Sequence, residues 1–258
     1  MPAMEPAMIW VPTLLLVALR VAGMVFFAPV FSNSAVPVKV RVVVSVAMAL
    51  AVLARLSRPV SVGAGGADLL AAGACELLIG GAIGYAARLI LTGVELGAFH
   101  ISSQMGLALA DVMNPLKADS PQAVGGLFRL LAVVVFLAVG GHRALVGGLL
   151  ESFETVPPTT GVAAGSLLNL AVAMLGASFV LALKVAAPVL IAMLAATVAL
   201  GLLNKMTPQC NLLSVGLSVR AMVALAVVAC SLGVVAPLVE AASARLSEGL
   251  QVLTVPVR

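Results

Sequence analysis

Long apolar stretches interrupted by single charged residues dominate this sequence of 258 residues, of which 62% are hydrophobic. A helix that crosses a lipid bilayer needs about 20 apolar residues, and a charge at the bilayer centre costs at least about 2.5–3.5 kcal/mol. Such a charge is tolerated where it faces protein or water. We therefore expect a membrane-derived protein whose intramembrane charges meet polypeptide. These charges are Arg20, Glu76, Arg88, Glu95, Asp111, Arg129, Lys184 and Arg220.

The composition argues against several broad classes of protein. With 14 basic and 10 acidic side chains, a soluble domain of this length lacks enough charge to cover its surface. The net charge of +4 is not concentrated in a basic cluster, so we expect no nucleic-acid partner. Cys75, Cys210 and Cys230 are far apart in apolar surroundings, which is typical of small buried hydrophobes. We expect neither a metal nor a cofactor, because no ligand spacing is present.

The pattern predicts an all-α fold of about six long helices arranged in hairpins. Turn-forming residues and prolines separate the segments. The second segment holds only 13 charge-free residues, about 20 Å of helix, which is short for a membrane span. The last two segments flank a polar turn and predict an antiparallel hairpin, with a kink at Pro188. The expected segments are 8–31, 38–56, 68–113, 123–150 with a break near 140–143, 165–204 and 212–239, followed by a short amphipathic tail.

Two pairs of glycines lie four residues apart in the third segment. They are Gly80 with Gly84, and Gly93 with Gly97. This spacing exposes backbone on one helix face and allows a second helix to approach closely, although 24 glycines also make chance pairs common.

The sequence contains few residues suited to catalysis. His100 and His142 are the two histidines, and no nucleophile elbow, zinc-protease or nucleotide-binding motif is present. We therefore expect a protein that is not an enzyme.

The intramembrane charges admit two interpretations. In a secondary transporter, Glu76, Glu95 or Asp111 would be a coupling site for protons or cations. The alternative, which we favour, is static pairing between helices or subunits. Several basic residues lack an acid within four positions, so their partners must come from distant segments or other chains. The residues to which we assign pairing are Arg20, Glu76, Arg88, Glu95, Arg129, Lys184 and Arg220.

An ordered set of short motifs along the chain resembles the FliR family, the export-gate subunit of flagellar type III secretion with T-type homologues in injectisomes. No single motif is specific, but their order over most of the chain is. The motifs are Arg20 with Ala28-Pro29-Val30-Phe31, Val36-Pro37 with Arg41, Gln104-Met105-Gly106, Asn114-Pro115, Gly141-His142, Glu151-Ser152-Phe153, Leu183-Lys184 with Pro188, and Pro208-Gln209 with Asn211, Gly216 and Arg220.

The resemblance implies a function, an architecture and partners. It implies a FliP-like part at 1–164 followed by a FliQ-like hairpin and tail at 165–258, in the bacterial inner membrane within the flagellar basal body. The implied partners are FliP and FliQ homologues, an FlhB homologue and unfolded flagellar proteins that pass through the shared channel. A secondary transporter is the main alternative, although no inverted repeat is evident. A purely structural scaffold is a third possibility.

The resemblance also implies a channel plug in the loop at 106–122. This sequence departs from the family there, because aliphatic side chains stand where the family often has aromatic ones. The predicted plug residues are Met105, Gly106, Leu107, Leu109, Met113, Asn114 and Pro115.

Overall fold

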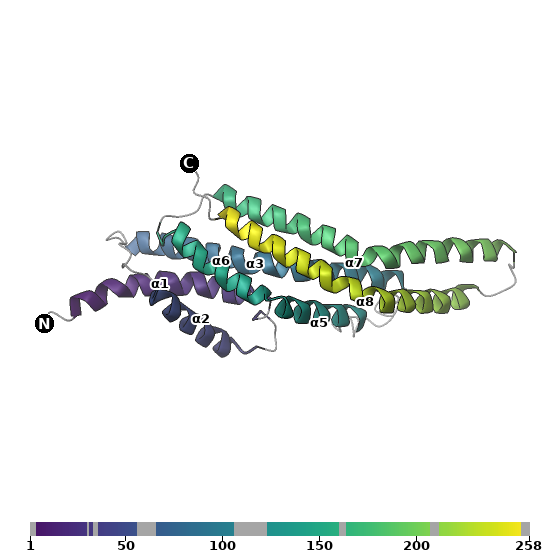
Figure 1. Cartoon of the computed structure of the whole chain (residues 1–258), viewed down its shortest axis with the longest axis horizontal. Helices are drawn as coiled ribbons and strands as arrows, with labels where there is room; N and C mark the ends of the chain where they lie inside the picture. Colours follow the sequence, from purple (N-terminus) through teal and green to yellow (C-terminus); the bar gives the residue numbers. More distant parts are fainter. Residues whose placement is uncertain are drawn as a thin grey trace. The chain divides into compact units, whose positions relative to one another are not determined.

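The computed structural model describes residues 4–29, 31–32, 36–55, 66–105, 123–159, 164–206 and 212–253. Within these ranges the regular structure is helical, which confirms the all-α prediction (Figure 1). The helices are α1 (Met4–Phe27), α2 (Val38–Leu53), α3 (Gly66–Gln104), α5 (Ala123–Ala138), α6 (Gly141–Thr155), α7 (Ala164–Met206) and α8 (Leu212–Leu253).

Four of the described helices contain a stretch that is long and apolar enough to cross a membrane. The stretches are Trp10–Phe27, Gly66–Gln104, Gly165–Leu203 and Ser218–Leu246. A fifth exists if α5 and α6 are one broken span. Gly140, with a left-handed φ of 83°, separates these two helices within the predicted break. Helix α2 has 16 residues, about 24 Å, and is not a candidate, as its short apolar stretch indicated.

The C-terminal boundary predicted for the last helix was wrong. Helix α8 does not end near residue 239 but continues to Leu253. Ser243 and Leu246 are buried, and Gly249 lies against Leu170 and Met174 of α7. The predicted tail is therefore packed as helix. The third segment is helical from Gly66 to Gln104, and its predicted continuation to 113 falls outside the described residues.

The chain forms two compact units. The first comprises Met1–Leu89, Gly140–Leu175 and Ser243–Arg258, and the second comprises Ile90–Val139 and Gly176–Ala242. Helices α3, α7 and α8 each contribute to both. The division into a FliP-like part and a FliQ-like hairpin is a statement about ancestry and stays a prediction.

In the first unit, α1 and α3 touch backbone to backbone. A Cβ at Gly80 would overlap the backbone of Arg20, and one at Gly84 would overlap the carbonyl oxygen of Met24. From the other side, a Cβ at Gly23 would lie 2.5 Å from the carbonyl oxygen of Leu77. The close packing predicted from the spacing of Gly80 and Gly84 is therefore confirmed.

In the second unit, the other glycine pair brings α3 against α7. A Cβ at Gly93 would lie 2.6 Å from the carbonyl oxygen of Ser178, and one at Gly97 would lie 2.8 Å from that of Ala182. The predicted hairpin of α7 and α8 is also confirmed. Gly216, near the start of α8, contacts Leu200 near the end of α7, so the two helices run antiparallel (Figure 1).

Candidate functional site

The most completely buried charge in the described part of the first unit is Arg20 in α1. Its side chain is 0% exposed, and its Nε donates to Oε2 of Glu76 in α3 at 2.5 Å. Glu76 is 2% exposed. The two residues are 56 positions apart in the sequence, so the pair ties α1 to α3. Each charge neutralises the other in a place where either alone is expensive.

Arg20 also caps the C-terminal end of α6. Its Nη1 donates to the carbonyl oxygen of Ser152 at 2.9 Å and to that of Val156 at 3.1 Å, and Nη2 donates to the same Val156 oxygen at 3.1 Å. The Ser152 oxygen also accepts from the Val156 N–H at 3.0 Å, and the C-terminal end of a helix carries partial negative charge. A guanidinium suits this position, because its N–H groups are arranged in a planar fork. One side chain therefore fixes α1, α3 and α6 together.

Aromatic and hydroxyl side chains complete the surroundings of Arg20. The guanidinium carbon lies 4.3 Å from the centre of the Phe153 ring, a cation–π arrangement. The hydroxyl of Ser152 donates to the carbonyl oxygen of Leu149 at 2.6 Å and accepts from Arg20 Nη1 at 3.3 Å. The motif Glu151-Ser152-Phe153 thus supplies three direct contacts to Arg20: the carbonyl oxygen and the hydroxyl of Ser152, and the ring of Phe153.

The second carboxylate oxygen of Glu76 faces the segment that follows α6. The backbone N–H of Thr159 donates to Oε1 of Glu76 at 3.4 Å. Thr159 has a φ of 82°, a left-handed conformation that costs about 1–2 kcal/mol for a residue with a Cβ. Sequence reasoning missed Thr159 and Val156. The only signal was their position around Pro157 and Pro158, which indicates a turn but not its partner.

The remaining predicted pairing residues are placed differently. Arg88 is exposed in the first unit; in the second unit, Arg129 and Lys184 are exposed, and Glu95 and Arg220 are half-buried. Across the described ranges, none of these five forms an ion pair with another described residue. The structure therefore brings together Arg20 and Glu76 alone from the predicted set.

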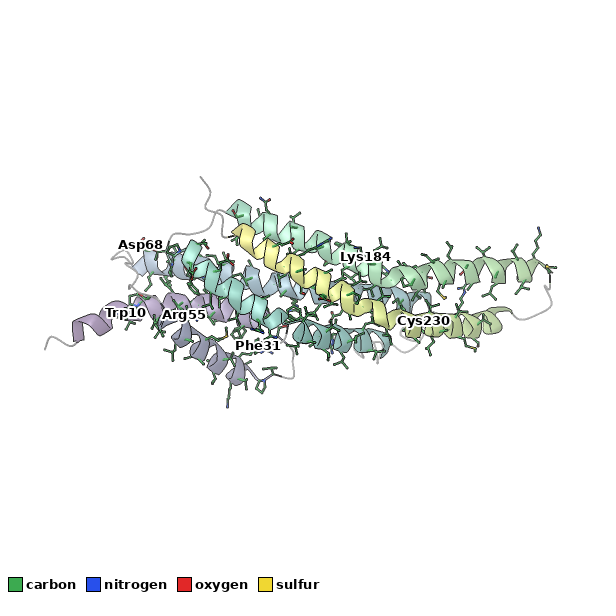
Figure 2. The ribbon with its side chains drawn as sticks, viewed as in Figure 1. Trp10, Phe31, Arg55, Asp68, Lys184 and Cys230 are labelled. Carbon is green, nitrogen blue, oxygen red and sulfur yellow. The ribbon has the colours of Figure 1, made fainter. Side chains whose placement is uncertain are left out.

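Lys184 illustrates the surroundings of these charges. It lies near the middle of α7 (Figure 2), in a stretch where Phe179, Val180, Leu183 and Ile191 are also exposed, with Phe179 57% and Leu183 63% exposed. An ammonium group on such a face requires an anionic or aqueous partner, since hydrocarbon offers neither.

The predicted plug lies mostly outside the described residues. Met105 is 2% exposed in the turn that ends α3, and its N–H donates to the carbonyl oxygen of Ile101 at 3.1 Å. The other predicted plug residues, Gly106, Leu107, Leu109, Met113, Asn114 and Pro115, fall in the range that the structure does not describe.

The described residues contain no group of three or more His, Cys, Asp or Glu side chains able to hold a metal. His100 and His142 are both exposed. The chemistry that the described part offers is therefore charge pairing and close packing between helices.

These features define an all-α membrane protein in which a buried charge pair, found among the described residues, joins three helices. The model of the family described as bacterial export proteins, family 1, matches residues 11–246, so the chain belongs to that family.

Its relatives include flagellar biosynthetic proteins FliR from several bacteria, which confirms the family predicted from the motifs. The protein of Pectobacterium carotovorum subsp. carotovorum is 29% identical over 234 residues, or 89% of this chain and 86% of the relative. That of Escherichia coli strain K12 is 29% identical over 224 residues, or 86% and 85%. That of Caulobacter vibrioides is 30% identical over 227 residues, or 86% and 88%.

Proposed function

We propose that this chain is a subunit of the flagellar type III protein export gate in the bacterial inner membrane. In this proposal it forms, with FliP and FliQ homologues and next to an FlhB homologue, the channel through which unfolded flagellar proteins leave the cytoplasm. Membership of the bacterial export proteins, family 1, and the FliR relatives support the flagellar export role. The chain itself performs no catalysis, and the energy for export comes from another component.

The observation that carries this proposal is the contrast between two kinds of intramembrane charge. Arg20 and Glu76 are satisfied within the first unit. Lys184, Arg129 and Arg220 are exposed or half-buried and form no ion pair with any residue in the described ranges. Each would cost at least about 2.5–3.5 kcal/mol in the centre of a bilayer. Partner helices that carry carboxylates remove this cost, so these charges are suited to subunit contacts.

Charge reversal on α7 tests the subunit contact. We expect Lys184→Glu to place like charges together and to abolish co-purification of the FliP and FliQ homologues. Lys184→Arg keeps the charge and should retain them. Lys205→Glu is the matched control, because Lys205 is exposed at the last turn of the same helix, next to the polar turn. An intact complex of the Lys184→Glu variant on a native gel would contradict static pairing at this position.

Arg220 on α8 provides an independent position for the same test. It is half-buried, so its reversal to Glu should disturb both the fold and the contact. Thermal unfolding of the isolated chain separates these effects: loss of assembly without loss of stability supports a subunit contact.

We also propose that 106–122 obstructs the closed channel, with Met105 as its buried attachment to the end of α3. Replacement of part of this loop by a short Gly/Ser linker should increase the leak of small ions through assembled gates. If both leak and export are unchanged, the plug role is wrong. If the leak is unchanged but export fails, the loop acts in transport without sealing.

The transporter alternative finds little support in the geometry of Glu76. A coupling carboxylate must release and rebind its ion, whereas Glu76 is held by a buried guanidinium and by the Thr159 N–H. Glu95 is half-buried and has no ion pair with a described residue, so Glu95→Gln is the informative variant. Normal export by this variant would remove the last described candidate for a coupling site.

A further inference from the structure

A cavity of about 220 Å³ lies between α2 and α6, both in the first unit. Its floor includes Val52 and Leu149, which are 5% and 0% exposed. Ala51, Val146 and half-buried Leu150 line its open side. The charge-pairing network around Arg20 does not use this cavity. Its lining is apolar apart from one charged side chain.

That charged side chain is Arg55, which follows the C-terminal end of α2 (Figure 2). It is exposed and forms no ion pair with a residue in the described ranges. The sequence around it is purely cationic: residues 6–67 contain no acid, and Lys39, Arg41 and Arg58 flank the apolar part of α2 together with Arg55. An anionic group is therefore the complementary ligand at this end of the cavity.

Helix α2 also has an apolar face opposite the residues that line the cavity, and that face is suited to hydrocarbon. Val42, Val43, Val46 and Leu50 are 46–66% exposed, although α2 is too short to be a membrane-span candidate. From Met48 to Arg55 the helix rises about 10 Å. This is enough for part of an acyl chain to lie along the helix with its head group at Arg55. Free phosphate would leave the apolar floor unfilled.

We propose that this cavity binds an anionic phospholipid, with an acyl chain on Val52 and Leu149 and the phosphate at Arg55. Glu151 and Glu154 of α6 are close in sequence to the lining but do not line the cavity. Neither forms an ion pair with Arg55. The proposal depends on the membrane setting of the chain and not on its role in export.

Native mass spectrometry of the full chain, purified in mild detergent, tests the head-group contact. The probes are phosphatidylglycerol and phosphatidylcholine with identical acyl chains. Arg55→Gln should lower retention of phosphatidylglycerol relative to phosphatidylcholine about fivefold, the factor expected for one basic residue beside anionic lipid. Arg143→Gln is the control, because Arg143 is an exposed arginine of the same unit that does not line the cavity. Unchanged retention in the Arg55→Gln variant would overturn the proposal.

Filling the cavity tests the acyl-chain contact. Ala51→Leu should lower retention of both lipids, and Val146→Phe serves the same purpose if the first variant unfolds. Both residues are exposed, and thermal unfolding checks each variant. A photo-crosslinking residue at Leu150, in the full chain within its native membrane, then identifies the occupant. Cross-linking to lipid supports the proposal, whereas cross-linking to a protein chain shows that a partner helix fills the cavity and overturns it.

Discussion

Replacing Arg20 by methionine should destabilise the isolated chain more than any other single loss of charge in its described part. The change removes the guanidinium but keeps a long apolar side chain in the same space. It leaves the Glu76 carboxylate, 2% exposed, without its counter-charge. It also removes the donors to the Ser152 and Val156 carbonyl oxygens at the end of α6.

The magnitude follows from these losses. Removing one partner of a buried ion pair costs about 3–5 kcal/mol, chiefly because the remaining charge is uncompensated. The double variant Arg20→Met with Glu76→Met has no buried charge. Its Ser152 carbonyl oxygen still accepts from the Val156 N–H, so the main losses are the hydrogen bonds of the Val156 oxygen and the Thr159 N–H, at about 1 kcal/mol each. The double variant should therefore be about 2 kcal/mol less stable than wild type, and more stable than Arg20→Met alone.

Chemical denaturation of the purified chain in mixed micelles measures these differences. Lys184→Met is the matched control, since it removes an exposed cation that forms no ion pair with a described residue. It should change the free energy of unfolding by less than about 1 kcal/mol. The reasoning is refuted if Arg20→Met costs no more than the control, or if the double variant is less stable than Arg20→Met.

Three further substitutions test the backbone features of the fold. Gly80→Ala should destabilise the chain by at least about 2 kcal/mol, because the added methyl group overlaps the backbone of α1; thermal unfolding is the measurement. Gly147→Ala, which places its methyl group in open space beside α6, should be neutral or stabilising by up to about 1 kcal/mol in the same assay. Thr159→Gly should stabilise the chain by about 1 kcal/mol by relieving its left-handed strain, and a loss of stability in denaturation would contradict that account.

The sequence predicted the helices well, because long apolar runs separated by proline and polar turns leave little choice of structure. Glycine spacing likewise predicted where α3 approaches other helices. Both signals are local, because a few neighbouring residues determine whether a segment is helical and which of its faces lacks side chains. The predicted C-terminal end of α8 was wrong because local signals do not show what a segment packs against. The segment after Glu240 was predicted only as a short amphipathic tail. In the structure it continues the helix, with Glu240, Arg245 and Glu248 exposed and Ser243 and Leu246 buried.

The charge network could be predicted only in part. The lack of a nearby acid indicated that the partner of Arg20 was distant, but no periodicity identifies Glu76 at a separation of 56 residues. The capping of α6 was equally hidden, because it uses backbone oxygens that every residue possesses. The left-handed conformation of Thr159 could not be predicted either, because the Thr159 N–H bonds to Glu76 of another helix.

We propose that the exposed intramembrane charges of this chain meet the helices of partner subunits. A photo-crosslinking residue at Val180, which is 45% exposed and lies one turn from Lys184 on α7, tests this contact in cells that assemble flagella. If Lys184 lies at a subunit contact, we expect a cross-link to a FliP or FliQ homologue, and this cross-link should disappear in the Lys184→Glu variant. Cross-linking to lipid alone would contradict it.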